Sequence, residues 1–401
     1  MSCEQAVSAT LTQLAQVETL IAAVTAACQS ENDTAGEQMA ADALASVKLA
    51  EKILGDISAD CAADAPMPMA VPSPDILASS VSPIASNFSV GQYIATGSKI
   101  PPSAAPDIVG AFRMAGNVAR YSYDDPMVYP GQQGVSHLHE FVGNTAVDYT
   151  TTFNSLRTTG NGTTQGGPVN RSGYWAPALL LGNDIRVPDY WNIYYKRVPS
   201  TSSHLPVGAS VAPLPTGLRM KSQNVTYKNA TTGVSGSFDA VLASIQVGQQ
   251  FCVTVEFPNL WDGQRIDCAD HMAHMSVPVW DGNQGKFIAP AGYGALIPTI
   301  TLFRFYTRQA GEDFTIAEFS SDRMMNAAPG STGHANYWEG WDTPTFRSIE
   351  ANALEKLLNC SDGQIGDGSQ LKRPSGFTFD QTPTRIALSD VTTTAPKVLI
   401  P

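Results

Sequence analysis

The chain has 401 residues, of which 43% are hydrophobic and only 15% are charged, and it contains 33 glycines and 27 prolines. This length suits one large domain with an appendage or two domains, and this composition favours a loop-rich β protein over a helical bundle. The net charge is −12 and no basic patch is present, so nucleic-acid binding is not expected.

The first sixty residues have the pattern of a helical hairpin. Residues 4–29 carry an apolar stripe at helical spacing, residues 34–57 carry a second one, and the link SENDT between them supplies polar helix caps. A two-helix hairpin cannot bury its own apolar face. Residues 1–60 should therefore pack as an extra layer on the rest of the chain, form a homo-oligomer or dock into a larger protein assembly.

The same segment concentrates negative charge. Residues 1–65 hold ten acids against two lysines, a net charge of −8, which leaves −4 for the rest of the chain. The N-terminus MSCEQAVSAT lacks a basic start followed by a long apolar core, so we expect no signal peptide. No stretch is expected to reach the length of a membrane span. These features predict synthesis in the cytoplasm.

Residues 61–106 are predicted to form a proline-rich linker. Eight prolines interrupt this stretch, which excludes a continuous helix or a central strand. It should act as an extended spacer or as a strap across a surface.

Residues 107–401 alternate short β-type runs, such as FCVTVEF and TITLFRFYT, with turn signals such as NGTTQGG and APAGYG. Only residues 346–359 read as a good helix. The expected fold class is mainly β: a jelly-roll or β-sandwich-like domain with long loops and a C-terminal extension, preceded by the N-terminal α-helical hairpin.

Five of the six histidines fall in three short segments. His137 and His139 form the motif HLH, His271 and His274 lie in DHMAH, and His334 lies in GHAN. On a strand, the spacing of HLH places both imidazoles on one face, whereas the spacing of DHMAH brings its two histidines together on a helical turn. All five are candidate ligands of one divalent metal ion.

Carboxylates accompany these histidines. Asp125, His139, Asp270 and Asp342 are the candidate catalytic residues, because imidazoles and carboxylates can act as general acid and base or hold a metal. The alternative is that these groups fasten long loops by hydrogen bonds. Because GxGxxG, Walker, GxSxG and HExxH motifs are absent, nucleotide cofactors and the common serine-hydrolase and zinc-protease schemes are not expected.

Aromatic residues form a further set of candidate ligand-binding positions, namely Tyr174, Trp175, Trp261, Trp338 and Trp341. Aromatic faces can stack on the C–H faces of sugars, so a polysaccharide is the expected ligand class. Ordinary core packing is the alternative for any single one of them.

Several segments, taken in order, resemble the DUF1996 family. They include FRM at 112–114, DDPMVYPG and SHLHEFVGN within 124–144, VPDYWNIYY at 187–195, LWDGQRIDCADHMAHMSVP at 260–278 and GHANYWEGWD at 333–342. The resemblance covers roughly residues 108–345. Members of this family are typically secreted and often attached to carbohydrate-binding modules, so the resemblance implies an extracellular, polysaccharide-related role without a defined reaction.

The sequence departs from the family pattern at its cysteines. The family usually has a cysteine shortly after FRM, where this chain has residues 115–117 (AGN). The family also has a CxxC-like pair after the dipeptide LR, which is 156–157 here and is followed by residues 158–161 (TTGN). We read most of the six cysteines present as free thiols, and Cys252–Cys268 is the only pair considered for a bridge. Lost disulfides and a missing signal suit a protein that folds in the cytosol and is carried outside on a particle.

The leading hypothesis is a surface-exposed structural protein of a phage or virus-like particle. It would dock through residues 1–60 and display a glycan-binding β domain, and we expect it not to be an enzyme. The alternative is a secreted-type carbohydrate-active enzyme, assisted by a divalent metal and using the clustered histidines and aspartates.

Overall fold

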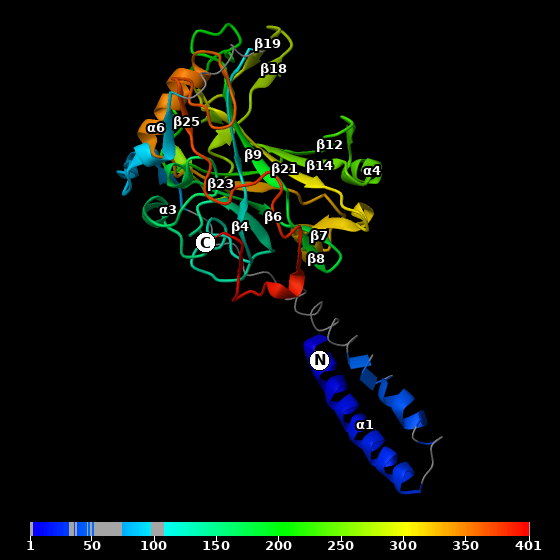
Figure 1. Ribbon diagram of the computed structural model, residues 1–401. Helices are drawn as coiled ribbons and strands as arrows, with labels where there is room; N and C mark the ends of the chain where they lie inside the picture. Colours follow the sequence, from blue (N-terminus) through cyan, green and yellow to red (C-terminus); the bar gives the residue numbers. More distant parts are fainter. Residues whose placement is uncertain are drawn as a thin grey trace. The chain divides into compact units, whose positions relative to one another are not determined.

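The computed structural model describes residues 3–31, 36, 38–45, 47–48, 50–51, 74–97 and 108–400 (Figure 1). The chain divides into two compact units, residues 1–69 and residues 70–401. The described part of the first is helical, and the second is mainly β, as the sequence predicts.

The first unit contains helix α1 (Cys3–Glu31), which matches the first predicted helix closely. Residues 38–45 are helical as well, and Figure 1 shows this second segment running alongside α1. Ala40 and Val47 are buried within the unit. The predicted second helix beyond residue 51 lies outside the described residues.

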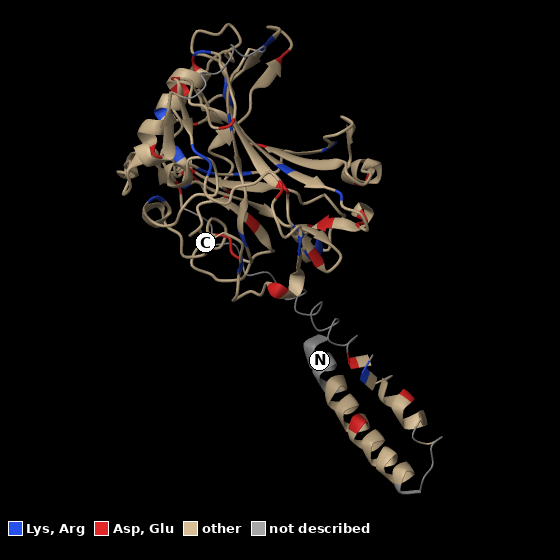
Figure 2. Ribbon diagram, in the orientation of Figure 1, with Lys and Arg blue, Asp and Glu red and all other residues tan. Residues whose placement is uncertain are grey.

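Helix α1 is unusually apolar and exposed. Its segment Thr10–Gln29 has a mean hydropathy of 1.3 over 20 residues and none of it is buried. Glu18 is the one charged residue of that segment (Figure 2). By length and composition the segment could cross a bilayer. This differs from the prediction that no stretch reaches the length of a membrane span. A leader sequence or a helix that packs in a protein core passes the same test.

The second unit is built around two large sheets. The seven-stranded sheet has the order β13 (Ser235–Gly236), β12 (Val225–Asn229), β14 (Gln250–Glu256), β21 (Thr299–Thr307), β9 (Tyr190–Arg197), β3 (Gly110–Gly116), β24 (Asn359–Cys360). The six-stranded sheet has the order β11 (Arg219–Ser222), β23 (Ala335–Trp338), β6 (Gly173–Pro177), β5 (His139–Gly143), β4 (Val118–Ser122), β27 (Lys397–Val398).

The two sheets share one hydrophobic core. Strand β9 alternates strictly, so that Ile193 and Tyr195 point inward while their neighbours stay half-buried. The Tyr195 hydroxyl lies 2.8 Å from that of Tyr174 on β6, in the opposite sheet. Strands β5 and β6 are buried along their whole length, because both of their faces are covered.

Smaller sheets and short helices surround the two large sheets. Two four-stranded sheets have the orders β22 (Ala317–Phe319), β7 (Leu179–Leu181), β8 (Asp184–Arg186), β26 (Arg385–Ala387) and β10 (Ser210–Val211), β20 (Ala295–Leu296), β15 (Leu260–Trp261), β17 (Met275–Ser276). Strands β18 (Val279–Asp281) and β19 (Lys286–Ile288) form a separate hairpin. The helices are α3 (Phe153–Thr158), α4 (Phe238–Ser244), α5 (Ser320–Met324) and α6 (Thr343–Ile349).

Residues 74–97 act as a strap, one of the two roles expected of the proline-rich stretch. Strand β1 (Ile76–Leu77) pairs with β16 (Arg265–Asp267), and β2 (Ile94–Thr96) pairs with β25 (Ser369–Leu371). The rest of the predicted 61–106 linker lies outside the described residues. Over its described part, this stretch is therefore a component of the β unit and not a free spacer.

Two local predictions need correction. The helix predicted over 346–359 is α6, which begins earlier because Asp342 caps it and which continues as a π-helical turn over Glu350–Leu354. Cys252 and Cys268, the pair considered for a bridge, are separate free thiols.

Candidate metal centre

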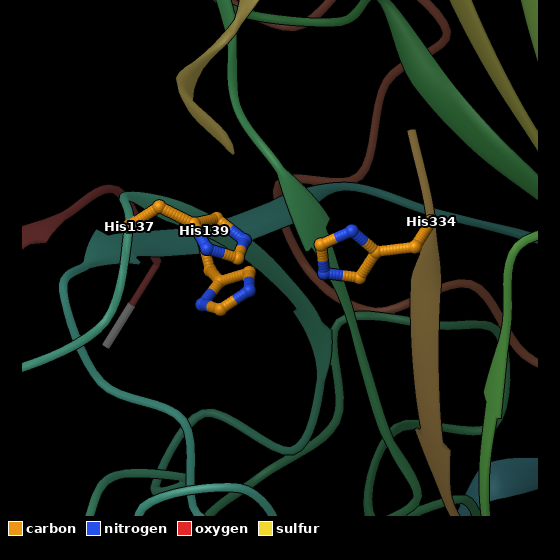
Figure 3. Close-up of side chains that lie close together, drawn as sticks. All are labelled: His137, His139 and His334. Atoms are coloured by element: carbon orange, nitrogen blue, oxygen red, sulfur yellow. The ribbon is translucent and has the colours of Figure 1, made fainter. Parts of the chain in front are cut away.

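Three histidines from distant parts of the chain meet in the β unit (Figure 3). His139 is the first residue of β5, His137 lies two residues before it, and His334 directly precedes β23. The ring centroid of His137 lies 4.1 Å from that of His139 and 5.0 Å from that of His334. One nitrogen from each ring lies within 4.8 Å of the other two. Strand β6 lies between β5 and β23 in the sheet, so the sheet order brings the two strand ends to one place.

Backbone carbonyls orient two of the rings. The Nδ1 atom of His139 lies 2.9 Å from the carbonyl oxygen of Asp124, and that of His334 lies 2.9 Å from the carbonyl oxygen of Thr332. Because a carbonyl oxygen only accepts, Nδ1 carries the proton in both rings and Nε2 keeps its lone pair. Histidine ligands of metals are commonly held in this way.

The three imidazoles are uncharged at neutral pH. Burial lowers the pKa of His139 and that of His334 to about 3, and it lowers the pKa of His137 well below its usual value. The nearby ammonium of Lys221 lowers all three further. Neutral imidazole is the form that binds a metal ion.

The centre contains buried polar atoms that have no hydrogen-bond partner among the described residues. These are Nε2 of His137, Nε2 of His139 and Oδ1 of Asn336. A buried polar atom without a partner costs about 1–3 kcal/mol, and most native proteins avoid it. Several such atoms in one cluster are what a cation would satisfy.

Asp125 supplies a carboxylate to the same cluster. Its Oδ1 accepts the backbone N–H groups of Met127 and Val128, each at 3.0 Å. Its Oδ2 accepts the side-chain amide of Asn336 at 3.3 Å and lies 3.9 Å from Nε2 of His139. Asp125 is 2% exposed, so its carboxylate is buried beside His139.

This set of donors fits a zinc-type cation. Three imidazoles with one carboxylate or water are typical ligands of zinc, and bond lengths of about 2.0–2.2 Å place tetrahedral ligands roughly 3.4 Å apart. The ligand atoms here are spread over as much as 4.8 Å, so the rings would rotate inward on binding. Lys221, opposite Asn336 in the β11–β23 ladder, opposes a cation, and the carboxylate of Asp125 offsets that charge.

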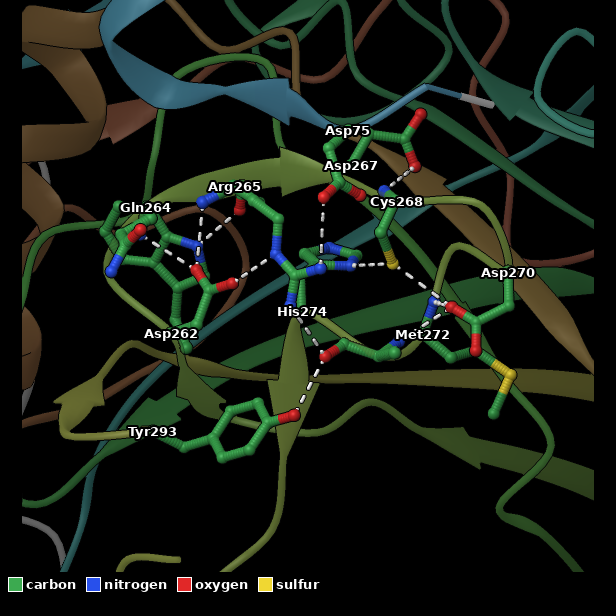
Figure 4. Close-up of polar contacts among 12 residues, drawn as sticks. Asp75, Asp262, Gln264, Arg265, Asp267, Cys268, Asp270, Met272, His274 and Tyr293 are labelled. Carbon is green, nitrogen blue, oxygen red and sulfur yellow. Dashed lines mark hydrogen bonds and ion pairs between the residues drawn. The ribbon is translucent and has the colours of Figure 1, made fainter. Parts of the chain in front are cut away.

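His271 and His274 do not join this cluster, which corrects their prediction as ligands of the same metal. Figure 4 shows His274 within a separate network of polar contacts around Cys268 and Arg265. His274 has Nδ1 at 3.1 Å from the Cys268 sulfur and Nε2 at 2.8 Å from the Arg219 carbonyl oxygen. His271 has Nδ1 at 2.6 Å from a carboxylate oxygen of Asp267. They lie in a loop and not on a helical turn, and they fasten that loop.

Two of the candidate catalytic carboxylates are structural. Asp270 accepts the backbone N–H groups of Met272 at 2.9 Å and Ala273 at 2.8 Å within the same loop. Asp342 is the N-cap of α6, where it accepts the backbone N–H of Thr345 at 3.0 Å. Of the predicted catalytic residues, only Asp125 and His139 belong to the histidine cluster.

The predicted sugar-stacking residues are mostly core residues. Tyr174, Trp175, Trp338 and Trp341 are at most 1% exposed, so a ligand cannot reach them. Trp261 is half-buried, and its indole N–H donates to the Arg265 carbonyl oxygen at 2.5 Å. A glycan surface made of these five residues is therefore incorrect, because four of them fill the interior.

Asn336 and Lys221 were missed in the sequence. Asn336 lies two residues after His334 in GHAN, and this spacing on an extended chain places both on one face. Lys221 gives no such signal, because it reaches the site only through the pairing of β11 with β23.

A family model described as a domain of unknown function, DUF1996, matches residues 125–341. The match includes Asp125, Asn336 and all three clustered histidines. Comparison with curated proteins gives no match, and neither does comparison with solved structures.

Proposed function

The chain belongs to the DUF1996 family, and we propose that its domain is a metal-stabilised structural module. In this proposal His137, His139 and His334 hold one divalent cation of the zinc class, with Asp125 as the fourth ligand. The supporting observation is the convergence of three imidazoles, two of which, His137 and His139, keep a buried Nε2 atom without a hydrogen-bond partner among the described residues. Bound there, the cation would tie the loop that precedes β5 to the start of β23.

Burial favours a structural ion over a catalytic one. The Nε2 atoms of His137 and His139 are shielded from solvent, so a polymeric substrate has no direct approach to the ion. A cavity of about 550 Å³ does exist in the unit, but its lining includes Pro206, Phe287 and Leu296 and no residue of the histidine cluster.

Metal analysis of the purified full-length chain tests this proposal. We expect close to one equivalent of metal per chain in the wild type and almost none in His139→Ala or His334→Ala. His204→Ala is the matched control, because His204 is exposed and outside the cluster. Adding zinc to the metal-free chain at 100 times its Kd should raise the free energy of unfolding by about 2.7 kcal/mol.

A wild-type chain that takes up no zinc, cobalt or manganese after chelation and dialysis would contradict the proposal. Equal metal content in His139→Ala and wild type would contradict it too. Cleavage of a glycan by the metal-loaded chain, lost in Asp125→Asn with metal content retained, would instead support the alternative of a metal-assisted carbohydrate-active enzyme. The position of Asp125 beside His139 is the observation that favours this alternative.

A second proposal concerns assembly. Helix α1 exposes Val17, Leu20 and Val24 at 40%, 66% and 53%. Apolar side chains exposed on one helix indicate a surface that a partner covers. We propose that the N-terminal unit joins a homo-oligomer or a larger assembly, such as the outside of a phage or virus-like particle, and that the β unit is displayed there.

A further inference from the structure

The seven-stranded sheet carries aromatic residues on the face turned away from the core. Tyr190 and Tyr194 occupy the half-buried positions of β9, alternating with the inward residues. Phe303 and Phe305 occupy equivalent half-buried positions on β21. These rings remain accessible, unlike the buried tryptophans.

These four rings form a continuous platform across two strands. The centroids of Tyr190 and Phe305 are 4.8 Å apart with planes at 25°, and those of Tyr194 and Phe303 are 4.6 Å apart. The planes of Phe303 and Phe305 differ by only 10°. The accessible parts of such a row of rings can contact the C–H groups of successive sugar units.

Basic side chains border the platform. The guanidinium of Arg113 lies 5.4 Å from the Tyr194 centroid, and the ammonium of Lys196 lies 5.1 Å from it. Arg373 lies 5.0 Å from the ring of Phe379, which packs edge-on against Tyr190. The register of the strands places Lys228 on β12 and Glu256 on β14 on this same face of the sheet.

The charge of this face is opposite to that of the whole chain. On the outward positions of the five central strands, Arg113, Lys196 and Lys228 stand against Glu256, in a chain of net charge −12. Asp362 also borders the face, but it is paired with Arg373 at 2.8 Å. The face therefore attracts anions.

A small cavity adjoins this cationic edge. It has a volume of about 260 Å³, and its lining includes Arg113, Asn192, Tyr194, Phe379 and the ion pair of Arg373 with Asp362. Arginine, an amide and aromatic rings in one hollow can bind a carboxylate or sulfate group together with the sugar ring that carries it.

We propose that this outer face binds an acidic polysaccharide, one whose sugars carry uronate or sulfate groups. The platform of Tyr190, Tyr194, Phe303 and Phe305 contacts the sugar rings, and Arg113 and Lys196 contact the anionic groups. This site is separate from the histidine centre, so metal loss that leaves the domain folded does not abolish it.

Affinity electrophoresis of the full-length chain tests this inference with three probes: polygalacturonate, dextran sulfate and neutral dextran. We expect retention by at least one acidic polymer, no retention by dextran, and weaker retention at 0.5 M than at 0.05 M salt. Lys196→Gln and Phe305→Ala should each weaken binding about three- to tenfold.

Lys286→Gln and Trp280→Ala on the β18–β19 hairpin are the matched controls, because they remove a lysine and an exposed ring that line neither cavity, and they should change binding less than twofold. Circular dichroism checks that each variant is folded; if Phe305→Ala is not, Lys196→Gln decides. Equal retention by dextran, no retention by either acidic polymer, or control variants that weaken binding as much as the site variants would overturn the inference.

Discussion

At the scale of single residues, burial determines which polar groups remain reactive. Desolvation keeps His139 and His334 uncharged, with pKa values of about 3. The same effect raises the pKa of the Cys252 thiol to about 11 and that of the Cys360 thiol to about 12. Histidines without charge are good ligands, whereas thiols that keep their protons are poor nucleophiles.

The two raised thiol pKa values predict slow alkylation. A thiol with a pKa of about 11 is ionised to roughly one part in a thousand at pH 8, so Cys252 and Cys360 should stay unmodified in a short pulse of iodoacetamide. Their reaction should speed up about tenfold for each unit of rising pH while the fold holds. Mass spectrometry of the native and the denatured chain measures this difference.

Cys28 on α1 is the internal comparison, because it is only half-buried. Modification of Cys252 or Cys360 in the native chain at pH 8, at the rate seen after denaturation, would contradict the prediction.

The candidate metal ligands show which contacts a local sequence pattern can predict. The HLH spacing alone paired His137 with His139 correctly, although only His139 lies on a strand. Nothing local connected His334 to them, because its position depends on the order of strands in the sheet. The DHMAH spacing was misleading, because a loop stabilised by Asp270 replaces the helical turn that it required.

At the scale of elements, one buried ion pair connects the two large sheets. Glu140 on β5 lies 3.1 Å from Arg304 on β21, and their side chains are 0% and 1% exposed. The hydroxyl of Tyr306 donates to the same carboxylate at 3.1 Å, and Arg304 also donates to the Pro177 carbonyl oxygen at 2.7 Å. Burial raises the pKa of Glu140, and Arg304 opposes that rise.

Arg304→Met should destabilise the β unit by about 3–5 kcal/mol, because it leaves Glu140 buried without its cation. Chemical denaturation of the full-length chain measures the change. The matched control is Arg385→Met, which breaks the exposed pair with Asp184 and should cost less than about 1 kcal/mol. Equal losses of stability in the two variants would show that the buried pair of Arg304 and Glu140 contributes no more than an exposed ion pair.

The positions of strands were easier to predict than the burial of their side chains. Runs of β-branched and aromatic residues located β14 and β21, where a strand with one covered face tends to alternate. The buried β6 lacks that alternation, so its Tyr174 and Trp175 were read as candidate ligand contacts. Burial on both faces is a consequence of topology, and a single strand's sequence does not reveal it.

At the scale of the whole molecule, the chain combines two units of different character. The β unit buries four of the six tryptophans, namely Trp175, Trp191, Trp338 and Trp341, and holds its own candidate sites. The helical unit exposes apolar residues instead, including Leu20 and Met39 at 66% and 74%. Each exposed apolar side chain that a partner covers contributes roughly 1.5–3 kcal/mol, so a few of them suffice for association.

The N-terminal unit should therefore control the oligomeric state. We expect the full-length chain to be larger than a monomer by light scattering, and Leu20→Glu with Val24→Glu to shift it toward the monomer. Gln13→Glu with Gln16→Glu is the matched control, because it adds the same charge at exposed positions of α1 without removing apolar surface. The fragment 70–401 should be monomeric and should keep the metal content of the full chain, because the histidine cluster lies within it.

A bilayer is the competing partner for the same helix, because Thr10–Gln29 has the length and hydropathy to span one. Flotation with phosphatidylcholine vesicles distinguishes a protein partner of α1 from a bilayer. Under the assembly proposal the full-length chain stays at the bottom of the gradient as an oligomer. A chain that floats, and that loses this property in Leu20→Glu with Val24→Glu, would instead assign α1 to a membrane. A full-length chain that is monomeric, does not float and behaves the same in that variant would contradict both assembly and membrane binding through α1.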